Sequence, residues 1–251
     1  DAASGASEFG RFATPGGGFS DSAIPQLSRS HFSEVWTLQL DDAHVFFQDF
    51  APMAWQALRQ LVYHVSFKSY LHSLSGGAIS NGDLSWGDAL ERVVEKMVCN
   101  FSEGRSGGFF FLTADRRYLV KTLTRGEQRQ LLKMLPRYYE HMRSSPRTLI
   151  ARICGVYCIT LHGQSCFFCV MENAFYGASA PLDTYDLKGS WVGRRRRAAA
   201  ATRLDADMER VPKLPPAIAT ELRAQCAADA ELLRSLGIMD YSLLLGVEQP
   251  Q

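Results

Sequence analysis

A single carboxylate, Asp240, interrupts an apolar run, 238–246 (IMDYSLLLG), near the C-terminal end of the 251-residue chain. Burying an ionised carboxylate in such a segment is costly unless a partner compensates its charge. The side chain is therefore expected to meet a cation, a metal ion or a substrate. The alternative is an aspartate at a strand entrance that hydrogen-bonds its own turn.

A second polar cluster lies upstream, where Asp186 and Lys188 stand two residues apart and Gly189 follows. An acid, a base and a glycine in this order could simply form a turn. A cation here could also serve as the partner of a distant carboxylate. The spacing alone leaves both interpretations open.

A third feature is the glycine-rich segment 102–108 (SEGRSGG), which precedes two predicted strands, 109–112 and 118–123. Glycines let backbone N–H groups approach phosphate oxygens, and a lysine adds a point charge. A Walker A loop would place its lysine directly after the glycines, whereas Lys121 lies thirteen residues beyond Gly108, on the second strand. That order is typical of protein kinases. The alternatives are a plain hairpin loop and a surface lysine.

Taken in order, these segments resemble the phosphatidylinositol phosphate kinase family over roughly residues 31–248. DLKGS at 186–190 and MDYSLL at 239–244 are specific to that family, and 47–53 (FQDFAPM), 103–107 and 118–122 also match. The resemblance implies an α+β, two-lobed kinase-like fold with antiparallel sheets and packed helices. Its N-lobe would span about 31–172, and the first part of its C-lobe would span about 173–251. A disordered stretch, 1–30, would precede the N-lobe.

The same resemblance assigns a nucleotide site. In a kinase, a carboxylate pairs with the strand lysine, and Glu127 or Glu140 could pair with Lys121; the alternative is that both face solvent. Backbone groups at 170–173 fall where a kinase hinge binds adenine. The implied ATP-binding residues are Gly104, Ser106, Gly107, Gly108, Lys121, Met171 and Glu172.

The resemblance also assigns the transfer chemistry. Asp240 would orient the lipid hydroxyl and accept its proton, Lys188 would lie near the transferring phosphoryl group, and Asp186 would fix Lys188. Positioned cations and a nearby acceptor suit phosphoryl transfer because charge spreads over the equatorial oxygens. The cofactors would be ATP and Mg²⁺. The acceptor would be a phosphatidylinositol monophosphate, with 4-phosphate converted to 4,5-bisphosphate as the first expectation.

The family's second, metal-binding aspartate and its activation segment do not occur before Gln251. We therefore expect a kinase domain that is incomplete at its C-terminus. The alternative function is a catalytically inactive fragment that binds nucleotide or phosphoinositide. A protein kinase is disfavoured because the sequence contains no His-Arg-Asp motif. The choice between 4-phosphate and 5-phosphate substrates stays open.

Composition fits a globular protein, with 46% hydrophobic and 21% charged residues. A net charge of +1 provides no general attraction for nucleic acid or other polyanions, so binding to an anionic membrane must come from local clusters. Residues 188–203 contain six cations and no acid, which favours a membrane-facing segment; the alternative is a solvated loop. We expect a cytoplasmic protein, peripheral at the cytosolic face of membranes, and a homodimer is possible.

Two helical patterns must support the N-lobe. One begins at Ala51 with Pro52 in its first turn, and the resemblance places it against the sheet. Its apolar residues at helical spacing are Trp55, Leu58, Val62 and Val65. The other covers 128–142, where Pro136 predicts a kink or two short helices.

A β-hairpin is predicted from 150–160 and 166–171, around His162 and Gly163. Four of the six cysteines lie within it. A zinc site is one interpretation, but Cys166 and Cys169 enclose two phenylalanines instead of turn residues, which favours reduced, buried thiols. The hairpin cysteines are Cys154, Cys158, Cys166 and Cys169.

The last predicted helix begins at Pro215-Pro216 and stops at Gly237, delivering the chain to Asp240. Its expected buried side consists of Ile218, Leu222, Cys226, Leu233 and Leu236. The acidic segment before it, 205–207, is expected to be a surface loop, with additional site carboxylates as the alternative. The strand after it, 242–247, is expected to present an open apolar edge.

Overall fold

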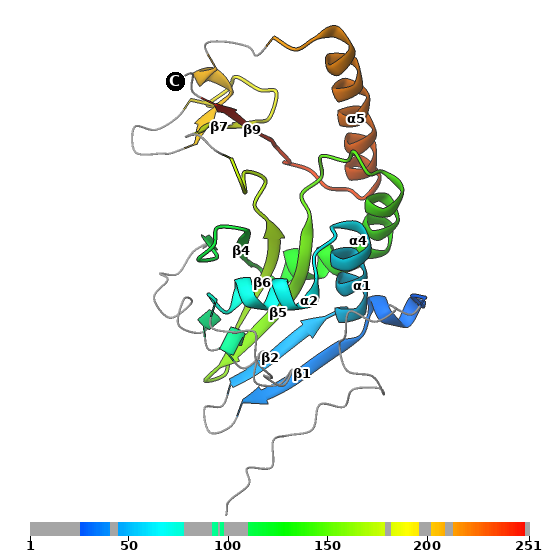
Figure 1. Ribbon diagram of the computed structural model, residues 1–251, viewed down its shortest axis with the longest axis vertical. Helices are drawn as coiled ribbons and strands as arrows, with labels where there is room; N and C mark the ends of the chain where they lie inside the picture. Colours follow the sequence, from blue (N-terminus) through cyan, green and yellow to red (C-terminus); the bar gives the residue numbers. More distant parts are fainter. Residues whose placement is uncertain are drawn as a thin grey trace, which may run out of the picture. The chain divides into compact units, whose positions relative to one another are not determined.

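The structure is a computed structural model. It describes residues 26–40, 45–77, 92–94, 96–97, 110–178, 182–195, 202–208 and 213–248 (Figure 1). The chain divides into two compact units. The first comprises residues up to Pro146 together with Ala151–Asn173, and the second comprises Arg147–Ile150 together with the chain from Ala174. Both units combine helices with antiparallel strand pairs, as the expected α+β class requires.

The first unit is built on a six-stranded sheet in the order β1-β2-β5-β6-β4-β3, in which every neighbouring pair is antiparallel. The two strands predicted around Lys121 are β3 and β4, and they form a hairpin. The six strands are β1 Val35–Leu40, β2 Val45–Phe50, β3 Phe110–Leu112, β4 Tyr118–Leu123, β5 Ile153–Leu161 and β6 Gln164–Glu172.

The predicted hairpin around His162 is confirmed as β5 and β6. Leu161 pairs with Gln164, so only His162 and Gly163 form the turn, and both have positive φ, 48° and 79°. This is the two-residue turn whose twist matches that of antiparallel strands. The four hairpin cysteines form no disulfide.

Apolar side chains from the helices and from the sheet form the core of this unit together. The helix predicted from Ala51 begins with Pro52 at N1, although it is α-helical only to Ala57 and continues as a short π-helix. Trp55, Leu58 and Tyr138 are buried. The described helices with known bounds in this unit are η1 Arg29–Phe32, α1 Pro52–Ala57, η2 Leu58–Val62, α2 Phe67–Leu74 and α4 Arg125–Ser144, and residues 92–94 and 96–97 are also helical.

Two predictions in this unit need correction. The stretch expected to be disordered includes Arg29 and Ser30, which lie in η1, and Phe32 at its end packs edge-on against Tyr139 with ring centroids 5.7 Å apart. Of the two outcomes predicted at Pro136, a kink or two short helices, the second is wrong, because α4 runs through the proline. Residues on both sides of the proline are buried, and their packing outweighs the lost backbone hydrogen bond.

A buried polar group lies between β2 and the helices. Asp49, in β2, places its Oδ1 atom out of contact with solvent and without a hydrogen-bond partner. Asp49 lines a cavity of about 20 Å³ together with Arg59, Tyr70 and Tyr157. That volume suits a water molecule but not a ligand. The Arg59 guanidinium donates to the Cys154 carbonyl and lies 4.5 Å from the centroid of the Tyr70 ring.

Replacing Asp49 by asparagine is expected to flatten the pH dependence of stability. Burial raises the pKa of Asp49 from 3.8 to about 7. The positive charge of Arg59 lowers this pKa, and the negative charge of Glu34 raises it further. Between these values the folded protein binds a proton that the unfolded chain does not, so the free energy of unfolding falls as pH rises. Asparagine mimics the protonated carboxyl and should avoid a loss on the order of a few kcal/mol between pH 5 and pH 8. Urea unfolding at both pH values tests this; equal pH dependence in the two proteins would contradict it.

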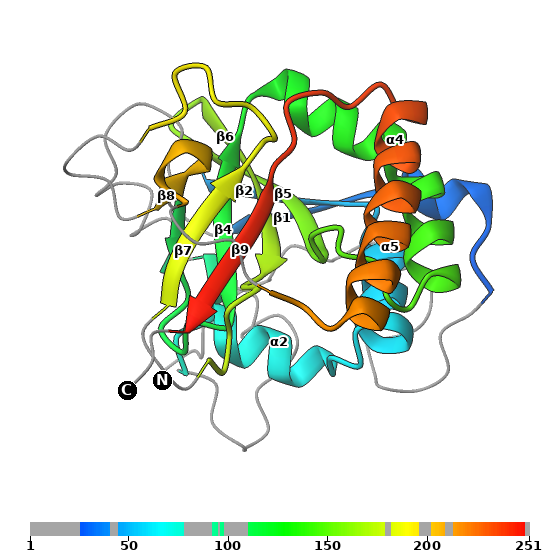
Figure 2. The same ribbon diagram turned by 90° about the horizontal axis from the view of Figure 1, so that it is seen from above.

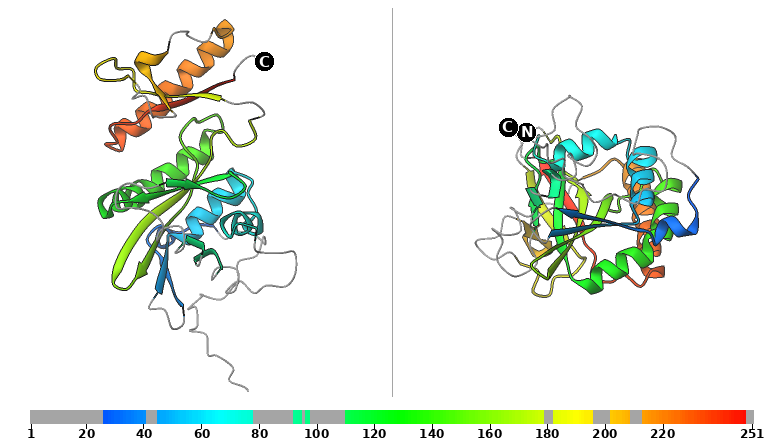
Figure 3. Two further views of the ribbon diagram at one scale, coloured as in Figure 1. Left: turned by 90° about the vertical axis from the view of Figure 1, so that its left-hand side faces the viewer. Right: turned by 90° about the horizontal axis from the view of Figure 1, so that it is seen from below.

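The second unit contains a three-stranded sheet in the order β8-β7-β9. β7 and β9 are antiparallel and lie side by side in Figures 2 and 3, whereas β8 pairs with β7 in parallel. Within the described residues β9 has one strand neighbour, so the open edge expected for this strand is present, and Leu244 is half exposed. The elements are β7 Leu182–Leu187, β8 Arg203–Leu204, η3 Asp205–Asp207, α5 Pro216–Ser235 and β9 Leu243–Glu248.

The expected buried side of α5 is wrong. The helix stands to one side of β7 and β9 instead of crossing their face (Figures 1 and 2), and Ile218 is 53% exposed. In the part of the chain that the structure describes, Asp229 is the one buried residue of α5. Its carboxylate accepts the Thr148 hydroxyl (2.7 Å) and the Leu149 N–H (2.8 Å), which ties the segment 147–150 to the helix. Among the helices that the structure describes, none combines the length and the hydropathy of a membrane-spanning segment.

Candidate functional site

Asp240 is positioned by the way α5 ends. Gly237, with φ 67°, donates its N–H to the Arg234 carbonyl (3.0 Å), and Ile238 donates to the Leu233 carbonyl (2.9 Å). This pair of bonds is the Schellman motif that the predicted glycine stop requires. Asp240 itself has φ 62°, a left-handed conformation that aspartate and asparagine tolerate better than most residues. The two left-handed residues turn the chain from α5 into β9.

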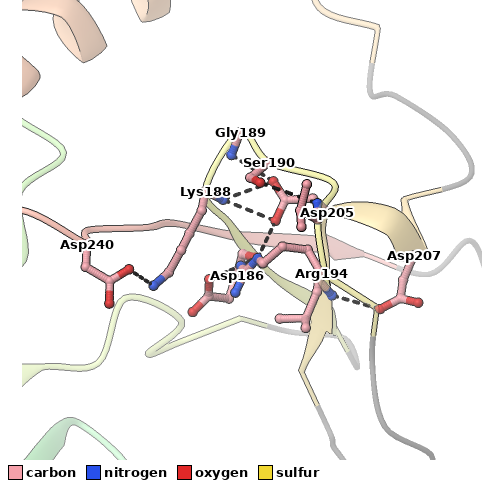
Figure 4. Close-up of polar contacts among 10 residues, drawn as sticks. Asp186, Lys188, Gly189, Ser190, Arg194, Asp205, Asp207 and Asp240 are labelled. Carbon is pink, nitrogen blue, oxygen red and sulfur yellow. Dashed lines mark hydrogen bonds and ion pairs between the residues drawn. The ribbon is translucent and has the colours of Figure 1, made fainter.

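Asp240 meets Lys188. The Lys188 ammonium donates a hydrogen bond to the Asp240 carboxylate, and the two groups form an ion pair (Figure 4). The predicted cation partner is therefore present, but the premise of burial is wrong, because the Asp240 side chain is 81% exposed. The hydrogen bond from Lys188, together with its charge, lowers the pKa of Asp240, so the carboxylate is ionised at neutral pH.

Asp186 does not fix Lys188, contrary to the prediction. Its Oδ1 atom pairs instead with Arg194 Nη2, at 2.5 Å, and the same guanidinium bonds Asp205 through Nε at 2.9 Å. Figure 4 shows Arg194 between the two carboxylates. Arginine is suited to this bridging role because its donors form a planar fork. The ion-pair partner of Lys188 is Asp240 and not Asp186.

Asp205 is the least exposed carboxylate of this cluster, at 6%. It lies in η3, within the segment expected to be a surface loop, so that prediction is wrong for this residue. Desolvation acts to raise its pKa, but hydrogen bonds from Arg194 and from the backbone N–H groups of Gly189 and Lys188 outweigh it and leave the pKa below its usual value. The carboxylate is therefore charged in the folded protein.

The first unit contains the predicted lysine–carboxylate pair. Lys121 Nζ on β4 lies 3.6 Å from Glu127 Oε1 in the first turn of α4, and both side chains are about half exposed. Glu127 also completes a capping box, in which its Oε2 accepts the Thr124 N–H at 2.7 Å. That backbone bond and the nearby Lys121 lower the pKa of Glu127. Glu140 pairs with Arg143 instead, at 3.4 Å.

The predicted hinge residues lie at the end of β6. Met171 is paired in register with Leu119 on one side and with Ile153 on the other. The Glu172 N–H donates to the Arg152 carbonyl at 2.9 Å, and its carboxylate pairs with the Arg152 guanidinium at 3.2 Å. That N–H is therefore already bonded, and adenine would have to be bound by other backbone groups of this segment.

Four predicted residues lie outside the described part of the chain: Gly104, Ser106, Gly107 and Gly108. Among the described residues, no group of three or more His, Cys, Asp or Glu side chains is placed to hold a metal ion. The sequence kept Asp205 only as an alternative site carboxylate and did not predict that it pairs with Arg194. The available signal was an acidic segment shortly after a run of arginines, but the run contains four consecutive arginines, 194–197, and nothing in the spacing distinguishes the first.

Comparisons with known proteins point in one direction. Residues 93–251 match a protein-family model described as Phosphatidylinositol-4-phosphate 5-Kinase. Phosphatidylinositol 4-phosphate 5-kinase 4 of Arabidopsis thaliana is 34% identical over 209 residues, which cover 80% of this chain and 24% of the relative. Phosphatidylinositol 4-phosphate 5-kinase its3 of Schizosaccharomyces pombe is 35% identical over 211 residues, or 80% and 26% of the two chains. The protein from Oryza sativa subsp. japonica named Phosphatidylinositol 4-phosphate 5-kinase 1 is 34% identical over 216 residues, or 80% and 25%. The chain thus spans about a quarter of the length of the curated relatives it matches.

Proposed function

Because the chain belongs to the phosphatidylinositol-4-phosphate 5-kinase family, we propose that it is part of an ATP-dependent lipid kinase. The substrate is a phosphatidylinositol monophosphate, and the first choice is the conversion of the 4-phosphate to the 4,5-bisphosphate, the activity named for its relatives. One observation carries the proposal: the two family-specific segments, DLKGS and MDYSLL, place Lys188 against Asp240.

In the proposed reaction an inositol-ring hydroxyl attacks the γ-phosphorus of ATP. A new P–O bond forms to the ring oxygen, the bond from the γ-phosphorus to the bridging oxygen breaks, and ADP leaves. Asp240 accepts the hydroxyl proton, which its ionised state allows. Lys188 places positive charge where the transferring group carries negative charge.

The two units correspond to the two kinase lobes in this proposal. The first unit is the N-lobe, in which Lys121 contacts the ATP phosphates and Glu127 holds the lysine ammonium. The second unit is the start of the C-lobe. Support comes from the order of the motifs and from the strand position of Lys121, which protein kinases share.

ATP is proposed to enter with Mg²⁺, an ion that proteins commonly bind through one or two carboxylates together with substrate phosphates. The described side chains alone do not form a metal cluster, so no step is assigned to the ion. When bound, it would neutralise charge on the phosphates.

The turn after β7 is the proposed membrane contact. Trp191 is 72% exposed and Val192 is 90% exposed, and the exposed Arg195 follows them. An exposed indole beside cations suits the interface of an anionic bilayer, where aromatic rings settle at headgroup level and each cation adds about 1 kcal/mol. The proposed location is the cytosolic face of membranes, where the anionic leaflet would attract these cations.

Replacing Trp191 by alanine is expected to weaken binding to vesicles that contain phosphatidylserine and phosphatidylinositol 4-phosphate by about three- to tenfold, because the ring loses its interfacial burial. Sedimentation with the vesicles at low and at physiological salt measures the effect. Tyr176→Ala, at another exposed aromatic residue of the second unit, is the matched control. Equal binding of the Trp191 variant and the unmodified protein would exclude this turn as the contact.

The test of the function is direct. The full gene product is incubated with radiolabelled ATP and with vesicles carrying the 3-, 4- or 5-phosphate of phosphatidylinositol. Label in the bisphosphate product from the 4-phosphate lipid is expected. Failure to label any inositol lipid, with folding verified by circular dichroism, would reject the proposal.

A further inference from the structure

The carboxylate of Asp205 holds both ends of the turn that contains Lys188. Its Oδ1 atom accepts the backbone N–H of Lys188 at 3.0 Å and that of Gly189 at 2.8 Å. Its Oδ2 atom accepts Arg194 Nε at 2.9 Å. Figure 4 shows these bonds converging on one side chain. An ionised acceptor with three donors makes strong, directional bonds, so the turn is closed around Asp205.

The closure matters for Lys188 because of the length of its side chain. A lysine has several rotatable bonds, so the position of its ammonium depends on where its backbone is held. Gly189 has φ 69°, a left-handed conformation that turns the chain directly after its N–H, toward Arg194, which donates to the other oxygen of Asp205. From this anchored base the ammonium reaches Asp240.

We propose that Asp205 is a positioning residue that anchors the backbone of Lys188 and Gly189, so that the Lys188 ammonium stays against Asp240. Asp205 acts through Lys188 and has no assigned contact with a substrate. The effect on turnover rests on the proposed kinase function, whereas the effect on the Lys188–Asp240 contact does not.

A purely structural role is the competing explanation. Asp205 begins η3, next to the short strand β8, and its bonds could do no more than close the turn. In that case its loss would lower the melting temperature without altering Asp240. A readout at Asp240 itself therefore separates the two roles.

The test is Asp205→Asn in the full gene product. Asparagine keeps the size of the side chain but loses its charge and presents an NH₂ group to donors. Lys188 should then leave Asp240, whose lowered pKa depends on Lys188 and, less, on Arg194. The pKa of Asp240, followed by carbon-13 NMR of its carboxyl group and identified by comparison with Asp240→Asn, should rise toward its ordinary value. The turnover number should fall by about 10- to 100-fold with the KM for ATP changed less than about threefold.

Two further variants make the result decisive. Asp207→Asn, in the same η3 turn, removes a carboxylate whose Oδ2 atom accepts the Leu204 N–H at 2.9 Å, and it should leave both readouts unchanged. Gly189→Ala perturbs the turn from the opposite side: no atom lies within 4 Å of the added methyl group, so the change acts through the strained φ. It should shift the Asp240 pKa in the same direction by a smaller amount, and it decides the matter if Asp205→Asn fails to fold.

The outcomes distinguish the two proposals. An unchanged Asp240 pKa in a folded Asp205→Asn or Gly189→Ala protein would overturn the positioning role, whatever the turnover. A shifted Asp240 pKa in a protein whose unmodified form phosphorylates no inositol lipid would support the positioning role and reject the kinase function.

Discussion

Replacing Asp240 by asparagine is expected to lower the turnover number for lipid phosphorylation by at least about 100-fold, because the amide cannot accept the hydroxyl proton. The fold should be preserved. Asparagine tolerates the left-handed conformation that Asp240 adopts at φ 62°, and an ion pair as exposed as that with Lys188 contributes little to the free energy of unfolding. Initial rates with saturating ATP and vesicles of phosphatidylinositol 4-phosphate measure the effect, and circular dichroism verifies folding.

The control for this substitution is another exposed carboxylate of the same unit that pairs with a cation. Glu231 on α5 pairs with Arg234 at 2.6 Å, and Glu231→Gln makes the equivalent change from acid to amide. It should leave turnover within about twofold, as expected for a surface pair away from the chemistry. An Asp240→Asn protein that keeps more than about a fifth of normal turnover would contradict the proton-acceptor role.

The second large effect is expected at Lys121. Lys121→Met removes the ammonium proposed to contact the ATP phosphates while keeping a long, unbranched side chain. It should lower kcat/KM for ATP by about 100-fold. Because the Lys121–Glu127 pair is half exposed, the free energy of unfolding should change by less than about 1 kcal/mol. Lys133→Met, at an exposed lysine of α4, is the matched control.

Glu127 has two roles, because it pairs with Lys121 and it caps α4, and one substitution can separate them. Glutamine can also complete a capping box, so Glu127→Gln should preserve the helix start while removing the charge that faces Lys121. A fall of about five- to tenfold in kcat/KM for ATP, smaller than that of Lys121→Met, is expected. Unchanged ATP kinetics in both variants would remove Lys121 and Glu127 from the nucleotide site.

Local patterns predicted the elements that the site needs. Alternating apolar residues around His162 and Gly163 predicted the β5–β6 hairpin, because a two-residue turn with positive φ fixes its own register. Gly237 predicted the end of α5 for a similar reason, since a left-handed residue satisfies the last carbonyl groups of a helix. Both features depend on residues that are close in sequence.

Predictions failed where the partner of a residue is distant. Asp186 stands two residues from Lys188, yet it pairs with Arg194, because β7 ends at Leu187 and the turn that follows brings Arg194 back to Asp186. The apolar stripe of α5 predicted a buried side, but periodicity shows which residues share a helix face and not what covers that face. The unbroken α4 also depends on distant packing around Pro136.

The sequence by itself determined the family, the order of the motifs and the residue types able to carry charge, because these depend on composition and spacing. Only the tertiary structure decided the pairings: Lys188 with Asp240, Lys121 with Glu127, and Asp205 with the turn after β7. Ion pairs and hydrogen bonds act over a few ångströms in space, and the separation of 52 positions between Lys188 and Asp240 leaves no periodic signal of their contact.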